Sequence, residues 1–483
     1  MKKKLTAAII NLGCKVNKYE SDSMKDKLTS AGIYVVEPED VADIYIVNTC
    51  SVTNMAQRKS RQMLRRAKKW NPEAVVIAAG CYVNAEHDVL KQEDFVDVVV
   101  SNNCKKDIAE VIFEYLNHHG SNDYYIDVNQ TKEYEEMGSL EASHLDHQRA
   151  YIKIQDGCNQ FCSYCIIPYT RGRVRSRKPE QILNEIERLA EQGVKEFVLT
   201  GIHISSYGVD FRGHDAQYDE VVSQKGIEDR NTEEQNRETV RLIDDLGKLV
   251  SAIADIPEVK RIRLGSLEPR IITKEFLTEI GKSGKVCPHF HLSLQSACNE
   301  TLKRMNRKYT IEMFEEKCNM IRSFFELPAI TTDVIVGFPG ETEEEFKTTV
   351  LNLTRIGLYE IHVFKYSVRA GTVAEKMENQ IPEDVKNSRS DILLSLTKRQ
   401  KEQFEQSLTG MEDEVLVEEI ADEKDFPNLR TCKRIDNSVG EFENASLSGN
   451  MEQKYYAGHT RRYIKVKLEA TKDVTNQILS VMM

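Results

Sequence analysis

Long hydrophobic runs are absent from this sequence. No stretch of the 483 residues approaches the ~20 consecutive apolar residues that a membrane span requires, so no membrane partner is expected. The start, MKKKLTAAIINLGC, has lysines, an apolar run and a cysteine, as a lipoprotein signal does. That run is short, is broken by Asn11 and leads into a charged helical stretch, so we interpret it as a buried first strand. A cytoplasmic protein is therefore expected.

A secretion signal is also missing, although the chain has eleven cysteines. Disulfides form mainly in oxidising compartments, and an odd number of cysteines does not suit a complete set of pairs. We therefore expect a reducing compartment, in which the cysteines are metal ligands, nucleophiles or core residues.

An excess of positive charge is the third absence. The net charge is −11, which argues against a general polyanion binder. The basic residues are nevertheless concentrated in three short clumps, one in each part of the chain. Each alone is most simply a solvated helix face or loop, but together they favour a nucleic-acid partner. The clumps are Arg58, Lys59, Arg61, Arg65, Arg66, Lys68 and Lys69; then Arg171, Arg173, Arg175, Arg177 and Lys178; then Arg461, Arg462, Lys465 and Lys467.

Strands and helices alternate twice along the chain, which has the length of two to four domains. The first run, residues 1–117, has short apolar strands separated by helical stretches and predicts an α/β domain with an open parallel sheet. Residues 118–143 are polar and irregular and are interpreted as a linker. The expected strands are 7–12, 43–48, 74–79 and 96–100, and the expected helices are 18–31 and 54–70.

The second run, residues 144–376, has six βα-type units and predicts an incomplete (β/α)6 barrel, whose active site would lie at the carboxyl ends of its strands. A polar excursion at 208–240 interrupts the second unit, and its role is open. Residues 377–483 are expected to form a long connecting helix (383–408) and a small all-β module. The expected barrel strands are 151–154, 196–200, 260–265, 289–294, 330–336 and 361–366.

Cys158, Cys162 and Cys165 follow the first barrel strand with the spacing C-x3-C-x2-C. A four-iron cluster takes four ligands, and this loop supplies three, so one iron would stay open for an external ligand. The amino and carboxylate groups of S-adenosylmethionine could fill it. A zinc site usually pairs C-x2-C with a second pair elsewhere. Three merely structural cysteines are a weak alternative, because a loop over a strand's carboxyl end is a site by position.

Cys14, Cys50 and Cys81 are far apart in the sequence, but each lies just beyond an expected strand of the N-terminal sheet. The carboxyl ends of parallel strands line one crevice, so these thiols could hold a second cluster with an open iron. Three unrelated buried cysteines are the alternative, and their shared position favours the site. Cys104 is a weaker candidate. The remaining cysteines lack partners at ligand spacing and are expected to be structural: Cys287, Cys298, Cys318 and Cys432.

With these motifs the chain resembles the radical-SAM methylthiotransferases over nearly its full length. The motifs are NLGCKVNKYES, NTCSVTN, AAGCY, KIQDGCNQFCSYCIIPYTRGRVRSR, HLSLQS, LKRMNRKYT and TTDVIVGFPGETEEEF. The segments GCKVN, KIQDGC and FCSYCIIP are most similar to those of the branch that acts on N6-threonylcarbamoyladenosine 3′ to the tRNA anticodon. The chain departs from the family at Ala297, where glycine is common, and in HVFKYSVRAGT, where the family usually has HVFPYSxRPGT.

The resemblance implies two [4Fe-4S] clusters and a C-terminal TRAM module. Cys158, Cys162 and Cys165 would hold the cluster that cleaves S-adenosylmethionine. The N-terminal cysteines, Cys14, Cys50 and Cys81, would hold an auxiliary cluster that delivers the methylthio group to carbon 2 of the adenine. The implied pocket for S-adenosylmethionine includes Gly201, Ser266, Glu268 and Gln295. For Ser266, Glu268 and Gln295, a role as ordinary polar residues at strand ends is equally consistent with the sequence.

The implied partners are a tRNA anticodon stem-loop, gripped by the basic clumps and the β module, and a flavodoxin- or ferredoxin-type electron donor. Two alternatives stay open. The first is a related methylthiotransferase that modifies isopentenyladenosine in tRNA, or a ribosomal protein. The second is a non-catalytic zinc protein that binds nucleic acid, which would be colourless where an iron–sulfur protein is brown.

Overall fold

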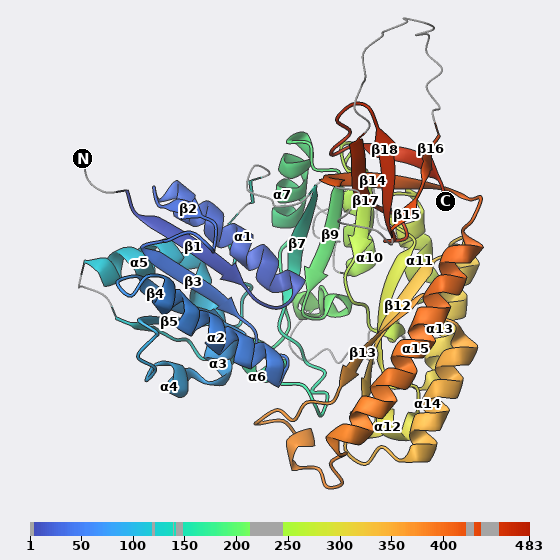
Figure 1. The fold of residues 1–483 in the computed structure, drawn as a ribbon, viewed down its shortest axis with the longest axis horizontal. Helices are drawn as coiled ribbons and strands as arrows, with labels where there is room; N and C mark the ends of the chain where they lie inside the picture. Colours follow the sequence, from blue (N-terminus) through green and yellow to red (C-terminus); the bar gives the residue numbers. More distant parts are fainter. Residues whose placement is uncertain are drawn as a thin grey trace, which may run out of the picture.

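The computed structural model describes residues 4–117, 121–138, 140–141, 148–212, 245–421, 429–435 and 454–483. Figure 1 shows an N-terminal α/β part beside a curved array of strands and helices, with a β-rich C-terminal part against one end of that array. Within the described residues, no helix has the length and apolar character needed to cross a membrane. Most of the excursion at 208–240 lies outside the described residues.

The N-terminal part is an open parallel sheet of strand order β2-β1-β3-β4-β5-β6. Its central strand β3 (Ile44–Thr49) is fully buried, as expected for a parallel strand covered on both faces. The other strands are β1 (Thr6–Asn11), β2 (Tyr34–Val36), β4 (Val75–Gly80), β5 (Val98–Val100) and β6 (Asp123–Tyr124). The four predicted strands and the parallel sheet are confirmed. The short β2 was not predicted, and β6 shows that the segment interpreted as a linker adds a strand to the sheet.

Helices cover both faces of this sheet. Side chains of α1 (Lys15–Ser30) and α5 (Ile108–Leu116) belong to the large core that continues into the barrel. Leu64 and Ala67 of α2 (Asn54–Trp70) pack in a separate core on the opposite face. The short helices α3 (Cys81–Ala85) and α4 (His87–Leu90) follow β4.

The central part is the predicted incomplete barrel, and all six predicted strands are confirmed. They form two sheets, β10-β9-β7 with a short antiparallel β8 (Arg175–Ser176), and β11-β12-β13. Single bridges, Ile262 to Val286 and Leu267 to Leu292, join the two sheets. The strands are β7 (Arg149–Asp156), β9 (Glu196–Gly201), β10 (Arg261–Leu264), β11 (His289–Gln295), β12 (Ala329–Val336) and β13 (Glu360–Lys365).

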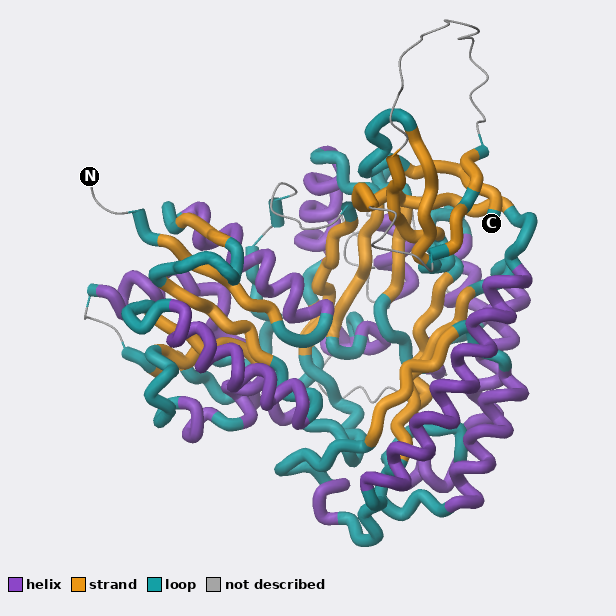
Figure 2. The backbone as a smooth tube through the Cα atoms, in the orientation of Figure 1, coloured by secondary structure: helices purple, strands orange, loops and turns teal. Residues whose placement is uncertain are grey.

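Alternation along the barrel strands separates an apolar outer face from a polar inner face. On β11, for example, Phe290 and Leu292 pack in the large core, whereas His289 and His291 point the other way. Figure 2 shows the helices outside this curved strand array. They are α7 (Pro179–Glu191), α10 (Leu246–Ala254), α11 (Lys274–Gly281), α13 (Ile311–Phe324) and α14 (Glu343–Ile356). The inner face is therefore the place for a polar ligand.

The C-terminal part begins with the predicted long helix, α15 (Glu383–Ser407), which packs along β13. The all-β module after it is confirmed as well. Its sheet has the order β15-β18-β17-β14-β19-β16 and is mainly antiparallel. The strands are β14 (Glu412–Ala421), β15 (Arg430–Thr431), β16 (Lys433–Arg434), β17 (Lys454–Thr460), β18 (Lys465–Ala470) and β19 (Ile478–Met482).

The β module contacts the amino-terminal side of the barrel strands, away from the cysteine loops. Arg461 donates from Nη2 to the backbone oxygen of Val286 over 3.1 Å. Arg462 is buried, pairs with Asp413 at 2.9 Å and donates to the backbone oxygen of Leu327 at 2.9 Å. Interpreting Arg461 and Arg462 as part of a tRNA-binding clump is therefore wrong, because their guanidinium groups hold the module to the barrel.

Candidate active site

Three cysteines meet at one edge of the N-terminal sheet, as predicted. Cys14 follows β1, Cys50 follows β3 and Cys81 begins α3 directly after β4. These strands are neighbours and run parallel, so their carboxyl ends lie side by side. Cys50 and Cys81 are buried, whereas Cys14 is exposed. We call these residues the N-terminal triad.

Two glycines allow the close approach of these strand ends. Gly13 has φ +113°, and a Cβ there would lie 2.9 Å from Cys50 Cβ and 3.0 Å from Cys50 Sγ. Gly80 has φ +98°, and a Cβ there would lie 2.7 Å from the backbone oxygen of Thr49. A larger residue would be strained at both positions and would push the cysteines apart.

The thiols of the N-terminal triad interact with each other and with an arginine of the barrel segment. Burial raises the pKa of Cys50 to about 11, and the neighbouring Cys81 adds to this rise. Arg171 donates from Nε to Cys81 Sγ at 3.1 Å, and Asn102 donates from Nδ2 to the same sulfur at 3.6 Å. The triad therefore lies at the contact between the N-terminal part and the barrel.

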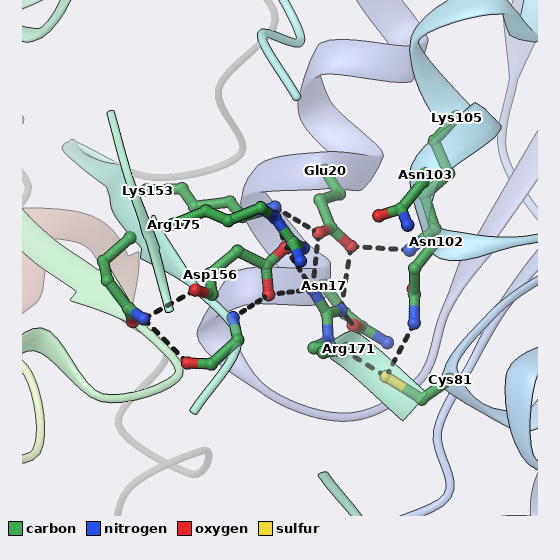
Figure 3. Close-up of polar contacts among 12 residues, drawn as sticks. Asn17, Glu20, Cys81, Asn102, Asn103, Lys105, Lys153, Asp156, Arg171 and Arg175 are labelled. Atoms are coloured by element: carbon green, nitrogen blue, oxygen red, sulfur yellow. Dashed lines mark hydrogen bonds and ion pairs between the residues drawn. The ribbon is translucent and has the colours of Figure 1, made fainter. Parts of the chain in front are cut away.

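A buried network of charges surrounds this contact (Figure 3). Glu20 of α1 accepts hydrogen bonds from Lys105 at 2.6 Å, Lys153 at 2.8 Å and Arg171 at 2.8 Å. Asp156 pairs with Lys153 at 2.6 Å and with Arg171 at 3.1 Å. Although burial opposes ionisation, the three cations hold the pKa of Glu20 well below its usual range. The network joins α1 to the inner face of β7.

The second basic clump largely belongs to this buried contact. Arg171 is 0% exposed and Arg175 is 2% exposed. Arg177, also buried, donates from Nε to Glu136 at 2.8 Å and pairs with Glu185. Its interpretation as a tRNA-binding surface is therefore wrong for these arginines, although Arg173 and Lys178 are exposed. No local pattern signals this burial, because the partner carboxylates come from distant segments.

The second cysteine group, Cys158, Cys162 and Cys165, lies in the loop after β7 and is called the loop triad. Cys158 is buried and the other two are half-buried. Gly157 has φ +72°, and a Cβ there would lie 1.8 Å from the backbone oxygen of Arg173, so only glycine fits. Phe161 also has a positive φ, of 48°, and its backbone oxygen accepts a hydrogen bond from Asn306 at 3.0 Å. The loop is thus wound tightly over the strand end.

An arginine also contacts the loop triad. Arg307 donates from Nη1 to Cys162 Sγ at 3.2 Å and from Nη2 to the backbone oxygen of Ser293 at 2.9 Å. Burial raises the pKa of Cys158 to about 12, partly opposed by a hydrogen bond from the backbone of Gln160. A bound cation would therefore be needed to keep such a thiol ionised near neutral pH.

The four predicted pocket residues lie at the carboxyl ends of the barrel strands. Gly201 ends β9, and a Cβ there would lie 2.9 Å from the backbone oxygen of Gln155. Glu268 is buried, accepts from Arg270 Nε at 2.8 Å and accepts a backbone hydrogen bond from Arg270 at 3.3 Å. Gln295 ends β11 with φ +73°, a strained value for this residue type. Ser266 is exposed just after β10.

The donor sets fit four-iron clusters better than single ions. Each triad offers three free cysteine sulfurs, and three protein ligands are the number that leaves one iron of a four-iron cluster open. The other cysteines have local contacts of a structural kind. Cys104 accepts a hydrogen bond from Ser101 Oγ at 3.3 Å, and Cys432 contacts Met483 Sδ at 3.7 Å.

Comparison with known proteins agrees with this division of the chain. Residues 152–353 match the radical SAM superfamily, and residues 6–101 match the uncharacterized protein family UPF0004. The first match covers the loop triad and most of the barrel, and the second covers the N-terminal triad.

Three relatives show the range of similar enzymes. The threonylcarbamoyladenosine tRNA methylthiotransferase MtaB of Bacillus subtilis is 35% identical over 476 residues, covering 99% of this chain and 93% of that protein. The MtaB of Aquifex aeolicus is 36% identical over 413 residues, covering 86% and 93%. The tRNA-2-methylthio-N(6)-dimethylallyladenosine synthase of Thermoanaerobacter pseudethanolicus is 34% identical over 457 residues, covering 93% and 89%.

Proposed function

The chain belongs to the radical-SAM tRNA methylthiotransferases, and from this premise we propose that it converts N6-threonylcarbamoyladenosine, 3′ to the tRNA anticodon, into its 2-methylthio derivative. The observation that carries the proposal is the 35% identity to a threonylcarbamoyladenosine enzyme over 99% of the chain. A dimethylallyladenosine substrate is the second candidate, because a synthase of that kind is 34% identical over 93% of the chain.

The two triads have separate roles in this proposal. The loop triad holds the cluster that binds S-adenosylmethionine, and the N-terminal triad holds the auxiliary cluster. When bound, these groups supply an electron for reductive cleavage of S-adenosylmethionine and the sulfur that is transferred. The position of Arg171 supports a shared reaction space, since it donates to Cys81 of the N-terminal triad and to Asp156, two residues before the loop triad.

The surrounding residues position the cofactors. Gly157 and Phe161 fix the loop triad in its tight turn. Arg307 donates to Cys162 and thereby stabilises negative charge on that sulfur. Gly201, Ser266, Glu268 and Gln295 line the strand ends, where S-adenosylmethionine would bind. Gly201 allows close approach, and Glu268 offers a buried carboxylate toward the ligand's amino group.

The tRNA surface is proposed to include the first basic clump, on α2. Unlike the other two clumps, it is largely exposed: Arg58, Lys59, Arg65, Arg66 and Lys69 face solvent. Cations of this kind bind backbone phosphates, while an unpaired anticodon-loop base can be turned into the barrel. The β module, a TRAM domain in this proposal, would contact the same RNA. The electron donor would be a flavodoxin or ferredoxin, and the site of action the cytoplasm.

Turnover with a synthetic substrate tests the proposed function. Cluster-loaded protein, S-adenosylmethionine and a reductant are incubated anaerobically with an anticodon stem-loop that carries N6-threonylcarbamoyladenosine, and nucleosides are analysed by mass spectrometry. We expect a 2-methylthio product and 5′-deoxyadenosine. Product from a dimethylallyladenosine stem-loop alone would establish the second candidate instead.

A further inference from the structure

The inner face of β11, β12 and β13 has a group of polar side chains outside the cofactor sites described above. His289 and His291 of β11, Asp333 of β12 and His362 of β13 belong to it, and we call these four residues the inner-face recess. Parallel pairing places Asp333 directly opposite His362, and Thr331 opposite His291. Alternation directs all four away from the helix-covered outer face.

The side chains of the recess lie close together. His291 Nε2 is 3.3 Å from Asp333 Oδ2, and His291 Nδ1 is 2.9 Å from Thr331 Oγ1. The rings of His291 and His362 stack with centroids 5.6 Å apart. His291 and Asp333 are half-buried and His362 is exposed, so a ligand in the barrel can reach them. The geometry thus offers imidazole donors beside one carboxylate acceptor.

His289 adds a sign that the recess takes a ligand. It is 8% exposed, yet its Nδ1 has no hydrogen-bond partner among the described residues. A buried polar atom without a partner costs free energy, which a bound ligand recovers. Burial lowers the pKa of His289 well below its usual range, and the nearby charges of Arg263 and Lys15 lower it further, so the ring is neutral. Lys15 comes from the start of α1, next to the N-terminal triad.

We propose that the inner-face recess binds the threonylcarbamoyl group on N6 of the target adenosine, with His362 facing its carboxylate and Asp333 accepting from its ureido N–H. This inference rests on the proposed function and extends it to the residues that select the substrate. A threonylcarbamoyl group has an anionic carboxylate, a hydroxyl and N–H donors, which match the recess. A dimethylallyl group is a hydrocarbon and would leave the same imidazoles and carboxylate desolvated without partners.

Each residue then has a distinct role. His362 is the exposed member and donates to the carboxylate. Asp333 binds the ureido group and, through the 3.3 Å contact to Nε2, orients His291. His289, packed against Tyr463 with ring centroids 5.1 Å apart, closes the inner end of the recess.

Binding of matched RNAs tests these roles without relying on turnover. Two synthetic anticodon stem-loops differ only at the threonyl carboxylate, which is free in one and a methyl ester in the other. Fluorescence anisotropy measures their affinity for cluster-loaded protein. Wild type should prefer the free acid by about 10- to 100-fold, the range for a hydrogen bond to a charged group. His362→Phe should bring this ratio close to one while leaving ester affinity within about 2-fold. Asp333→Asn should weaken both RNAs alike.

The control is His87→Phe, since His87 is a half-buried histidine of the N-terminal part that pairs with Asp123. This variant should bind the free-acid RNA and the methyl-ester RNA as wild type does. An unchanged iron content would show that each variant keeps its fold. An unchanged acid-to-ester ratio in His362→Phe would overturn the inference. Zn²⁺ binding would also overturn the inference if cluster-loaded wild type binds the ion and His362→Phe and Asp333→Asn each abolish that binding. His291, Asp333 and His362 would then form a metal site. Failure of the proposed function is separate, because it shows as wild type making no methylthio product from the free-acid RNA.

Discussion

Arg171 donates a hydrogen bond from Nε to Cys81 Sγ over 3.1 Å, and the same guanidinium pairs with Glu20 and Asp156. One buried side chain therefore connects the N-terminal triad, helix α1 and the end of barrel strand β7. The position of the N-terminal triad relative to the barrel consequently depends on a charge network as well as on apolar packing.

Replacing Arg171 by glutamine should destabilise this contact. Glu20 would keep Lys105 and Lys153, and Asp156 would keep Lys153, but each carboxylate would lose one buried cation. A buried charge left with no partner costs about 3–5 kcal/mol, so the loss of stability here should be smaller than that. We expect the first transition in anaerobic chemical unfolding to move to lower denaturant. Lys178→Gln, an exposed change in the same segment, is the control and should leave the transition in place.

The same variant should alter the proposed auxiliary cluster. Hydrogen bonds to cysteine sulfur stabilise the reduced state of an iron–sulfur cluster, so removing one lowers its reduction potential. The potential of the auxiliary cluster is measured by a redox titration followed by electron paramagnetic resonance. The titration uses protein whose loop triad is changed to alanine, so that only the auxiliary cluster contributes to the signal. An unchanged potential in Arg171→Gln would show that this hydrogen bond does not act on the cluster.

Acid should weaken the contact between the barrel and the β module through Glu196. Burial opposes its ionisation, but Arg263, Arg149 and Arg261 hold its pKa at about 2, below the ordinary 4.5. Its ionised form therefore contributes stability above about pH 4.5, and the contribution of about 3 kcal/mol is lost as pH falls toward 2. Denaturant unfolding at pH 7 and pH 3 measures this loss.

Glu196→Gln provides the comparison. The variant should be less stable than wild type at pH 7, and the difference should narrow as the pH falls, because the glutamine does not titrate. Glu180→Gln, at an exposed position of α7, should follow wild type at both pH values. A constant difference between wild type and Glu196→Gln down to pH 3 would contradict the depressed pKa.

The strand-end positions of both triads could be predicted because they depend on local sequence. Buried apolar runs such as IYIVNT fix where a parallel strand ends, and the cysteine follows at once. Residues 118–143 were interpreted as a linker, but Asp123 and Tyr124 within them form a strand that pairs with β5 of the sheet. Two residues are too short for a periodic signal, so only the neighbouring strand determines their pairing.

The buried charges could not be predicted because their partners come from distant parts of the chain. Arg171 and Arg177 looked like a basic surface, yet Glu20 and Glu136 neutralise them in the fold. The inner-face recess was missed for the same reason. His291, Asp333 and His362 come from three separate strands, and each alone resembles an ordinary polar strand residue.

The basic surface of α2 should account for part of the tRNA affinity. Changing Arg58, Arg65 and Lys69 to glutamate removes three exposed cations. The slope of log affinity against log salt should fall by about 0.7–0.9 for each phosphate that the protein no longer neutralises. Exposed lysines on the outer side of the barrel give a matched triple control: Lys274 on α11, Lys282 just after α11, and Lys347 on α14. Equal effects of the two triple variants would indicate general electrostatics rather than an α2 interface.

The two triads should divide the reaction between them. Changing Cys158, Cys162 and Cys165 to alanine should abolish 5′-deoxyadenosine formation, because S-adenosylmethionine then has no cluster to receive an electron from. Changing Cys14, Cys50 and Cys81 to alanine should remove about half of the roughly eight irons expected for two four-iron clusters. That variant should still cleave S-adenosylmethionine but make no methylthio product. Anaerobic assays that measure iron, 5′-deoxyadenosine and methylthiolated nucleoside separately resolve these outcomes.

Cys104→Ala is the matched control for both triple variants. Cys104 follows β5, which pairs with β4, the strand before Cys81. Its sulfur accepts a hydrogen bond from Ser101, and the residue packs in the large core. Its replacement should therefore leave iron content and both products near wild type. Loss of a cluster in this variant would make Cys104 a ligand. Methylthio product from the N-terminal triple variant would show instead that sulfur delivery does not depend on Cys14, Cys50 and Cys81.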